Sequence, residues 1–448
     1  MLLICFRGKK LTKMSLFFNP AIISILLLCI LCLKRVNVLL AIIISTLVAG
    51  LLSGMNVKDV MDVFISGMGG NSETALSYIL LGAFAATMVH SGFTDKLSSK
   101  IIEIISGKKY ILLLILLFIA MASQNIVPIH IAFIPIIIPS LLVIMNKLKI
   151  DRRAVASVLA FGLKMPYITI PVGFGLIFQN LIADNMVQNG VNVLRQDIWK
   201  YNVILGIAML FGLFVALFIS YRKPRVYEDK PLTIASVDNV ACNKYTLFVV
   251  SLAAFLTFVV QLLTHSLPLG ALVGLGVIFS LKVIPKNKMD HMMNEGIYLM
   301  GYVAFVMLVA AGFASVLKES GAINSLVTTA VTYLPENIII TALVMLILGL
   351  FITIGIGTSF GTIPILAVLF VPICVKLGFN IPQIVVLLSA SAALGDAGSP
   401  ASDTTLGPTA GLNADGQHNH IYDTCIPTFL HYNIPLILFA ILGIYLFA

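Results

Sequence analysis

Residues 394–405 read Leu-Gly-Asp-Ala-Gly-Ser-Pro-Ala-Ser-Asp-Thr-Thr, with the two carboxylates at Asp396 and Asp403. The segment is otherwise apolar and rich in residues that break helices. Backbone that leaves the helix inside a bilayer is stable only where protein or a water-filled cavity satisfies its polar groups. An ionisable residue at that depth usually marks a transport or coupling site. The stretch therefore predicts a broken membrane helix with a protected polar site at the break.

The composition agrees with a chain embedded in lipid. Of its 448 residues, 59% are hydrophobic and 10% are charged, whereas soluble domains carry about 25% charged residues. The runs 38–55 and 245–263 can cross about 30 Å of hydrocarbon as helices, and they lack the alternation typical of barrel strands. We therefore expect an all-α polytopic membrane protein. The net charge of +9 is then explained by basic residues beside the spans, and not by nucleic-acid binding.

The two halves of the sequence resemble each other at an offset of 229 residues, which aligns Gly92 with Gly321 and Phe84 with Phe313. Near the end of each half the offset becomes 231, where Tyr201-Asn202 aligns with Tyr432-Asn433. Further aligned positions are Ile134-Pro135-Ile136 with Ile363-Pro364-Ile365, and Pro171 with Pro400. A shared offset for several Gly and Pro positions predicts an internal repeat.

Each repeat is expected to hold five spans, one of which is a broken helix, and one re-entrant hairpin. An odd number of crossings turns the second repeat upside down, as in many secondary transporters, and gives about ten spans and two hairpins, with the broken helices meeting at the midplane. The expected division is an N-terminal tag or extension at 1–16, a first repeat at 17–220 (hairpin 110–146, broken helix 154–184), a cytoplasmic linker at 221–244, and a second repeat at 245–448 (hairpin 337–378, broken helix 381–411). Met1 and Met14 are both candidate start residues.

Charge favours hairpins over crossings for the two split apolar units. A hairpin places the two basic clusters that flank the first unit on one side of the membrane, as the positive-inside rule prefers. These clusters are Lys108 with Lys109, and Lys147, Lys149, Arg152 and Arg153.

The hairpin tips carry small and polar residues whose hydroxyl and amide oxygens suit a hard cation such as Na⁺. The alternative is that these small residues allow close packing of helices. The residues concerned are Ser123, Gln124 and Asn125 in the first tip, and Gly357, Thr358 and Ser359 in the second.

The helix breaks supply the charged candidates. Burial is expected to let Asp396 and Asp403 exchange a proton for another cation, although an acid can also simply cap a half-helix. Lys164, in the break of the first repeat, either neutralises these acids, binds a substrate carboxylate, or extends toward the cytoplasm. The remaining candidates at the two breaks are Thr169, Gly395, Ser399, Ser402 and Thr404.

The loop 413–423 is rich in His and Asp. His418 and His420 are weak candidates for a metal site or a pH sensor. We expect instead that this polar loop forms a solvated gate or lines a vestibule on the cytoplasmic side, and we expect no metal or organic cofactor.

The run from Gly395-Asp396 through Ser399-Pro400 to Ser402-Asp403-Thr404-Thr405 resembles the signature of NhaC-type Na⁺/H⁺ antiporters. Residues 406–418, 427–435, 123–135 and 151–154 resemble a bacterial branch that includes proteins named as amino-acid (histidine) permeases. The resemblance covers the chain after Met14. It implies the fold of the wider ion transporter superfamily, an elevator mechanism, a homodimer in the bacterial inner (plasma) membrane, and a cation-binding role for Asp396 and Asp403.

The leading interpretation is a cation-coupled secondary active transporter with Na⁺ or H⁺ as the coupling ion. A Na⁺- or H⁺-coupled amino-acid permease on the same fold remains open. A remote alternative is an intramembrane aspartyl protease, because Leu394-Gly395-Asp396 and Tyr422-Asp423 are similar to its two motifs; here they occur in the reverse order, and we expect no enzyme activity.

Overall fold

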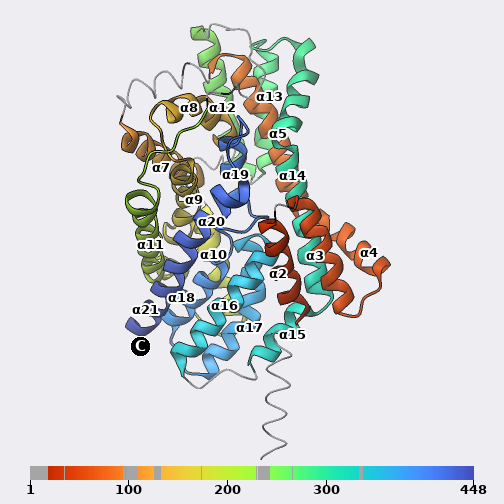
Figure 1. The fold of residues 1–448 in the computed structure, drawn as a ribbon, viewed down its shortest axis with the longest axis vertical. Helices are drawn as coiled ribbons and strands as arrows, with labels where there is room; N and C mark the ends of the chain where they lie inside the picture. The colour runs from red at the N-terminus through yellow and green to blue at the C-terminus, as the bar shows by residue number, and fades with distance from the viewer. Residues whose placement is uncertain are drawn as a thin grey trace, which may run out of the picture.

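The computed structural model describes residues 19–34, 36–93, 96, 108–125, 133–172, 174–228, 230, 243–264, 266–331 and 337–448. Within these ranges the secondary structure is helical and contains no strand, as Figure 1 shows. The expected extension at 1–16 and residues 126–128 of the first hairpin tip lie outside the described residues. The predicted all-α fold is therefore confirmed for the part of the chain that the structure describes.

Helical elements fill both halves of the chain. The first half holds α2 (Pro20–Leu33), α3 (Val38–Leu52), α4 (Val57–Gly67), η1 (Met68–Asn71), α5 (Ser72–His90), α7 (Lys109–Asn125), α8 (Phe133–Lys147), α9 (Arg152–Thr169), α10 (Phe174–Gln188), η3 (Arg195–Asp197), α11 (Ile198–Val215) and η4 (Ala216–Ser220). The second half holds α12 (Lys244–Thr264), α13 (Leu267–Ser280), η5 (Lys286–Lys288), α14 (Met289–Glu319), α15 (Ala322–Val331), α16 (Ile338–Ile356), α17 (Ser359–Lys376), α18 (Ile381–Ala393), α19 (Asp403–Leu412), η6 (His420–Cys425), α20 (Ile426–Thr428), η7 (Phe429–Asn433) and α21 (Ile434–Leu446).

Six of the described helices are long and apolar enough to cross a membrane, and the number rises to eight if each of two bent helix pairs counts as one span. Other apolar helices, such as α2 with 14 residues and α3 with 15, fall short of the about 20 residues that a full crossing needs. The count of ten spans therefore stays a prediction.

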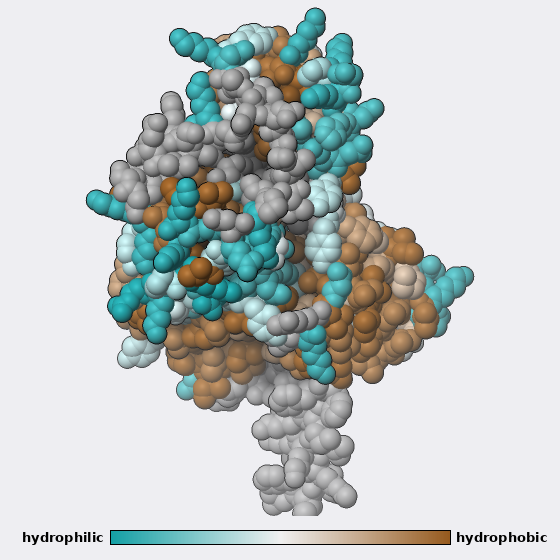
Figure 2. Space-filling view, turned by 45° about the horizontal axis from the view of Figure 1, so that its top comes forward, coloured by the Kyte–Doolittle hydropathy of each residue, from teal (hydrophilic) through white to brown (hydrophobic). Residues whose placement is uncertain are grey.

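The outer surface matches a lipid environment. Figure 2 shows a broad apolar surface over the side that carries α3 and α4, while hydrophilic residues gather toward the top of the view. The apolar side chains exposed on α3 and α4 include Leu51, Leu52, Val57 and Ile65. Exposed apolar patches of this size are uncommon on soluble monomers, so this face is suited to acyl chains.

The long helices α5 and α14 cross in close contact, one from each half (Figure 1). A Cβ on Gly82 would lie 2.6 Å from the carbonyl oxygen of Gly296, and a Cβ on Gly296 would lie 2.3 Å from the amide nitrogen of Ala83. Neither position can hold a side chain without moving the backbones apart. The two glycines therefore set the distance between the halves, as small residues do at membrane helix interfaces.

The second hairpin consists of α16 and α17, which are joined by a tight turn. Gly357 ends α16 with a positive φ of 78°, and Thr358 is the N-cap residue of α17. By length each arm can cross a membrane, so the re-entrant placement depends on the charge argument and stays a prediction. The turn nevertheless lies inside the protein, because Gly357 and Ser359 are buried.

Both predicted broken helices contain a non-helical segment. Between α9 and α10 the chain bends by 48°, and Ile170 at the end of α9 is extended. Between α18 and α19 the chain leaves the helix from Leu394 to Ser402. Lys164, which was predicted to lie in the break, and Pro166 still belong to α9, and the helix ends only at Thr169.

A buried ion pair joins the start of α9 to the loop after α19. Nη1 of Arg152 donates to Oδ1 of Asp415 over 2.6 Å, and Nη2 donates to Oδ2 over 2.5 Å. The guanidinium lies 4.3 Å from the centre of the Tyr227 ring in the linker. Burial alone would raise the pKa of the Asp415 carboxyl, but the hydrogen bonds from Arg152 hold it below its usual value. The pair thus ties α9, the linker and the loop together.

Candidate functional site

The break between α18 and α19 is built around a glycine. Gly395 has a φ of 84°, and a Cβ there would lie 2.6 Å from the carbonyl oxygen of Leu350 in α16. A residue with a side chain would be strained by the backbone conformation and would also clash. Gly395 therefore lets the chain turn out of α18 while packed against α16, and it places Asp396 directly after the turn.

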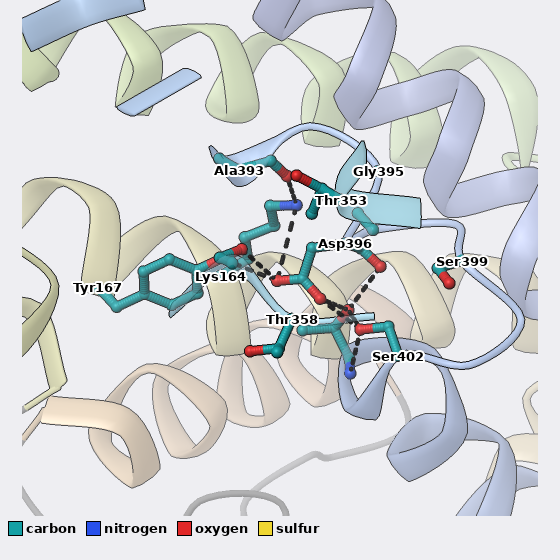
Figure 3. Close-up of polar contacts among 12 residues, drawn as sticks. Lys164, Tyr167, Thr353, Thr358, Ala393, Gly395, Asp396, Ser399 and Ser402 are labelled. Carbon is teal, nitrogen blue, oxygen red and sulfur yellow. Dashed lines mark hydrogen bonds and ion pairs between the residues drawn. The ribbon is translucent and has the colours of Figure 1, made fainter. Parts of the chain in front are cut away.

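Asp396 lies at the centre of a set of hydroxyl groups (Figure 3). The Asp396 side chain is 5% exposed. Oδ2 accepts hydrogen bonds from the hydroxyls of Tyr167 at 2.9 Å and Ser359 at 2.8 Å. Oδ1 accepts from the hydroxyls of Ser402 and, at 3.2 Å, Thr404. The donors come from α9, α17 and the start of α19, so three separate elements meet at one carboxylate.

Lys164 supplies the positive charge of the site. The ammonium group is fully buried, donates a hydrogen bond to the carbonyl of Ala393, and lies 4.0 Å from Oδ2 of Asp396. The alternative that Lys164 extends to the cytoplasm is therefore wrong, because the side chain turns inward, as Figure 3 shows. A buried ion pair of this kind is expensive to form and strongly destabilising when only one partner is removed.

Helix ends add to the electrostatics of this pair. The N-termini of α17 and α19 begin beside Asp396, since Ser359 opens α17 and Ser402 caps α19. Helix α18 ends at Ala393, and the carbonyl of Ala393 accepts a hydrogen bond from the ammonium group of Lys164. Helix N-termini favour negative charge and C-termini favour positive charge, so both members of the pair are stabilised by helix ends.

Two asparagines stabilise the backbone at the two breaks in the same way. Asn202 donates to the carbonyl of Ile168 at 3.0 Å, and Asn433 donates to the carbonyl of Ala397 at 2.8 Å. Asn433 also accepts from the amide of Gly395 at 3.3 Å. Ile168 and Ala397 are related by the offset of 229 residues, and the asparagines by that of 231. The two hydrogen bonds are therefore counterparts, which supports the predicted repeat.

Asp403 and Tyr78 lie near the pair without contacting it as closely. Asp403 occupies the first turn of α19, and the Ser402 hydroxyl lies 3.5 Å from its Oδ1. Tyr78 of α5 is buried, and its hydroxyl has no hydrogen-bond partner among the described residues. Tyr78 interacts electrostatically with Asp403 and Asp396, so α5 contributes to the surroundings of the two carboxylates.

The remaining predicted residues divide into those that line the break and those that do not. Thr358 lies beside Asp396 in Figure 3, and Gly357 packs against the carbonyl of Ala401. The Ser399 hydroxyl donates to the carbonyl of Ile354 in α16 at 3.4 Å. These three therefore shape the protein around the carboxylate, while the hydroxyls that donate to Asp396 belong to other residues.

Two other predicted residues, Ser123 and Thr169, donate hydrogen bonds to backbone carbonyls of their own helices and not to Asp396. The Ser123 hydroxyl donates to the carbonyl of Ala120 one turn earlier, at 2.7 Å. Thr169 donates to the carbonyl of Met165 at 2.9 Å and packs against Gly206 of α11. The side chains of Gln124 and Asn125 lie outside the described residues. Among the parts of the chain that are described, the first tip thus brings no side chain into contact with Asp396.

The prediction of a solvated loop is wrong for His418, which is buried, whereas His420 is partly buried and Asn413, Gly416 and Asn419 are exposed. Nε2 of His418 lies 2.7 Å from the Thr424 hydroxyl, and Nε2 of His420 lies 2.9 Å from the carbonyl oxygen of Pro400. His418 is 3% exposed. The His418 side chain is turned toward η6 by its contact with Thr424. The two imidazoles hold backbone and hydroxyl partners, which leaves the metal-site alternative without support.

Sequence reasoning missed Tyr167, Ala393 and Asn433 as parts of the site. A signal for each was present. Tyr167 and Asp396 are 229 residues apart, as are Lys164 and Ala393. Both contacts therefore join residues that the internal offset aligns. Asn433 belongs to Tyr432-Asn433, which the sequence aligns with Tyr201-Asn202.

Comparison with known proteins identifies the family. Residues 158–444 match the Na⁺/H⁺ antiporter family, and residues 19–105 match a second family described as the Na⁺-H⁺ antiporter family. The chain is 45% identical over 433 residues to "Uncharacterized membrane protein VP2115" of Vibrio parahaemolyticus serotype O3:K6 (strain RIMD 2210633), covering 94% of this chain and 98% of that protein. It is also 45% identical over 436 residues to "Putative amino acid transporter YuiF" of Bacillus subtilis (strain 168), with the same coverage.

The crystal structure of the YdaH transporter of Alcanivorax borkumensis is similar with a TM-score of 0.44 at 12% identity, over 87% of this chain and 88% of that one. The sequence matches, together with the apolar helices, decide the assignment: the chain belongs to the Na⁺/H⁺ antiporter family and is a multi-pass membrane protein that acts as a secondary transporter.

Proposed function

We propose that the transporter binds Na⁺ or H⁺ at Asp396 in exchange for the ammonium group of Lys164. The buried pair of Lys164 and Asp396, 4.0 Å apart and surrounded by hydroxyls, is the observation that carries this proposal. In a medium of low dielectric, a carboxylate without a counter-charge is costly. Asp396 is therefore expected to be neutralised at every stage, by Lys164, by a proton or by a metal cation.

The hydroxyl shell suits such an exchange. A Ser, Thr or Tyr hydroxyl donates a hydrogen to a carboxylate, but it can also turn that hydrogen away and present a lone pair to a cation. Tyr167, Ser359, Ser402 and Thr404 already surround the two carboxylate oxygens. These hydroxyls and the carboxylate would form an oxygen site for Na⁺ when Lys164 withdraws, with Asp403 as a second acid at the rim.

The direct test is transport in proteoliposomes with imposed gradients. An inward-directed Na⁺ gradient should drive H⁺ out, read by an internal pH dye, and an imposed pH gradient should drive uptake of labelled Na⁺. Both fluxes should occur without any amino acid. Absence of both fluxes in liposomes that contain folded protein would overturn the proposal.

A second candidate function is an amino-acid permease coupled to Na⁺ or H⁺. It is favoured by the buried ammonium of Lys164, which can bind a substrate carboxylate, and by the name of the Bacillus subtilis relative. Here Lys164→Gln separates the two candidates. If Lys164 competes with a cation, the variant should bind Na⁺ more tightly than wild type, and its apparent KM for Na⁺ should be lower. If Lys164 holds a substrate carboxylate, the variant should lose amino-acid uptake.

We also propose an elevator mechanism in a homodimer of the bacterial inner membrane. The hairpins and broken helices would move together against α2 and α3 as a scaffold. In support, the site joins α9, α17 and α19 by short hydrogen bonds, while α2 meets the α16–α17 hairpin through the apolar contact of Ile25 with Gly355. Apolar contacts without hydrogen bonds can slide at lower cost than the polar core of the site.

A further inference from the structure

A cluster of two imidazoles and one carboxylate lies at the end of the α5–α14 crossing, away from Asp396. His90 is the last residue of α5, and His291 and Glu295 lie one turn apart near the start of α14. We propose that these three residues form a binding site for a divalent transition-metal cation, with Zn²⁺ as the representative. The proposal goes beyond the proposed function and does not depend on it.

The geometry brings the ligand atoms toward a common point. Nε2 of His90 lies 2.8 Å from Oε2 of Glu295, and Nε2 of His291 lies 3.2 Å from Oε1 of the same carboxylate. One ligand atom from each of the three residues lies within 4.8 Å of the others. A tetrahedral Zn²⁺ with bonds of about 2.0–2.1 Å needs ligand atoms about 3.3 Å apart. The observed spacing therefore needs only small side-chain movements to hold an ion.

The placement of the ligands on their helices favours a preformed site. His291 and Glu295 are four residues apart and thus face the same side of α14. His90 comes from α5, which packs closely against α14 through Gly82 and Gly296. The two imidazole rings meet edge to face, with centroids 5.6 Å apart. A bound metal would join the first half of the chain to the second at this point.

The chemistry of the three residues points to a transition metal and not to an alkali or alkaline-earth cation. Imidazole nitrogen binds Zn²⁺, Cu²⁺ and Ni²⁺, whereas Mg²⁺ and Ca²⁺ prefer oxygen ligands only. The exposed fraction of the side chains is 10% for His90, 19% for Glu295 and 58% for His291. An ion can therefore enter from the His291 side, where a water molecule would complete four-fold coordination.

The C-terminal part of α14, which packs against α4, provides an internal control. The positions related to His291, Glu295 and His90 by 229 residues are Asp62, Ser66 and Glu319. They offer carboxylates and a hydroxyl but no imidazole. A true His-dependent site should thus bind metal at the N-terminal part of α14 only, and Glu319→Gln is the matched variant for a carboxylate outside the cluster.

The test is metal binding to the full-length protein, purified in detergent with a tag that contains no histidine. Equilibrium dialysis with Zn²⁺ measures stoichiometry and affinity, and the visible absorption of bound Co²⁺ reports four-coordinate geometry. Wild type and Glu319→Gln should bind one equivalent with the same affinity and spectrum. His90→Ala, His291→Ala and Glu295→Gln should each weaken binding by at least about tenfold and lose the Co²⁺ spectrum.

His291→Ala keeps the test decisive even if the buried variants fold poorly, because His291 is the most exposed of the three side chains. Zn²⁺ should also raise the melting temperature of wild type but not of His291→Ala, since a ligand that binds only the folded state stabilises it. Equal Zn²⁺ affinity in wild type and His291→Ala, or no saturable binding to wild type, would show that the cluster is an ion pair only.

Discussion

The hydroxyl of Tyr167 donates a 2.9 Å hydrogen bond to the carboxylate of Asp396, and the two residues are separated by 229 positions, the offset that aligns the two halves of the chain. Lys164 and Ala393 show the same relation. If a two-fold axis relates the halves, residues at equivalent positions can contact each other only close to that axis. The buried ion pair thus marks the place where the two broken helices meet.

Loss of the Tyr167 hydroxyl should weaken cation binding. A hydrogen bond to a charged group contributes about 1.5–3 kcal/mol, so Tyr167→Phe should raise the apparent KM for Na⁺ by about 10- to 100-fold. The measurement is Na⁺-dependent flux in proteoliposomes. Tyr445→Phe is the matched control, because that side chain is 68% exposed. An unchanged KM in Tyr167→Phe would remove this hydroxyl from the cation site.

The paired asparagines should be equivalent for stability but not for transport. Asn202→Ala and Asn433→Ala each leave a buried carbonyl without its side-chain donor, which costs about 1–3 kcal/mol. Both should lower the melting temperature in detergent by similar amounts. Only Asn433→Ala should also strongly reduce flux, because its break carries Asp396. Equal transport by the two variants would argue against a special role for the second break.

An elevator predicts that a cross-link between α2 and α16 stops transport. A Cβ on Gly355 would lie 3.2 Å from Cγ1 of Ile25, which brings the two positions within reach of a disulfide. The double variant Ile25→Cys/Gly355→Cys, made without the native cysteines, should lose flux under oxidant and regain it with reductant. The single variants serve as controls. Full transport by the cross-linked protein would contradict sliding at this interface.

The loop after α19 should make folding sensitive to acid. Burial lowers the pKa of the His418 imidazole well below its usual 6.5. As pH falls through about 6.5, the unfolded chain takes up this proton before the folded one does, so stability decreases. His418→Gln should therefore reduce the loss of melting temperature between about pH 7 and about pH 5. His291→Gln, measured with a chelator present, is the control at an exposed histidine. If His418→Gln lost as much melting temperature as wild type over this pH range, the His418 imidazole would not be the source of the acid sensitivity.

Much of the fold followed from patterns that depend on local physics. The continuous apolar runs indicated helices, and the segment around Gly395 and Pro400 contains the break because its residues disfavour a continuous helix. Asp396 stood out because a carboxylate in an apolar segment is costly unless it is paired. These features require no knowledge of which helices become neighbours.

The partners of Asp396 depended instead on tertiary contacts. Tyr167 and Ala393 are apolar or weakly polar residues in ordinary helical sequence, and only the crossing of the two halves brings them to the site. The burial of His418 likewise follows from packing against Thr424 and not from loop composition. The cluster of His90, His291 and Glu295 depends on the contact between α5 and α14, of which the sequence reveals only the four-residue spacing on α14.

The most direct measurement is coupled Na⁺ and H⁺ flux in proteoliposomes that contain Asp396→Asn. Asp184→Asn is the matched control, since its carboxylate pairs with Arg195 at an exposed position. Because Asp396→Asn leaves Lys164 buried without its partner, the double variant Asp396→Asn/Lys164→Gln is measured beside it. Flux at the level of empty liposomes in both Asp396 variants, with normal flux in Asp184→Asn, is the predicted result. Coupled flux at the wild-type rate in folded Asp396→Asn would contradict a cation site at this carboxylate.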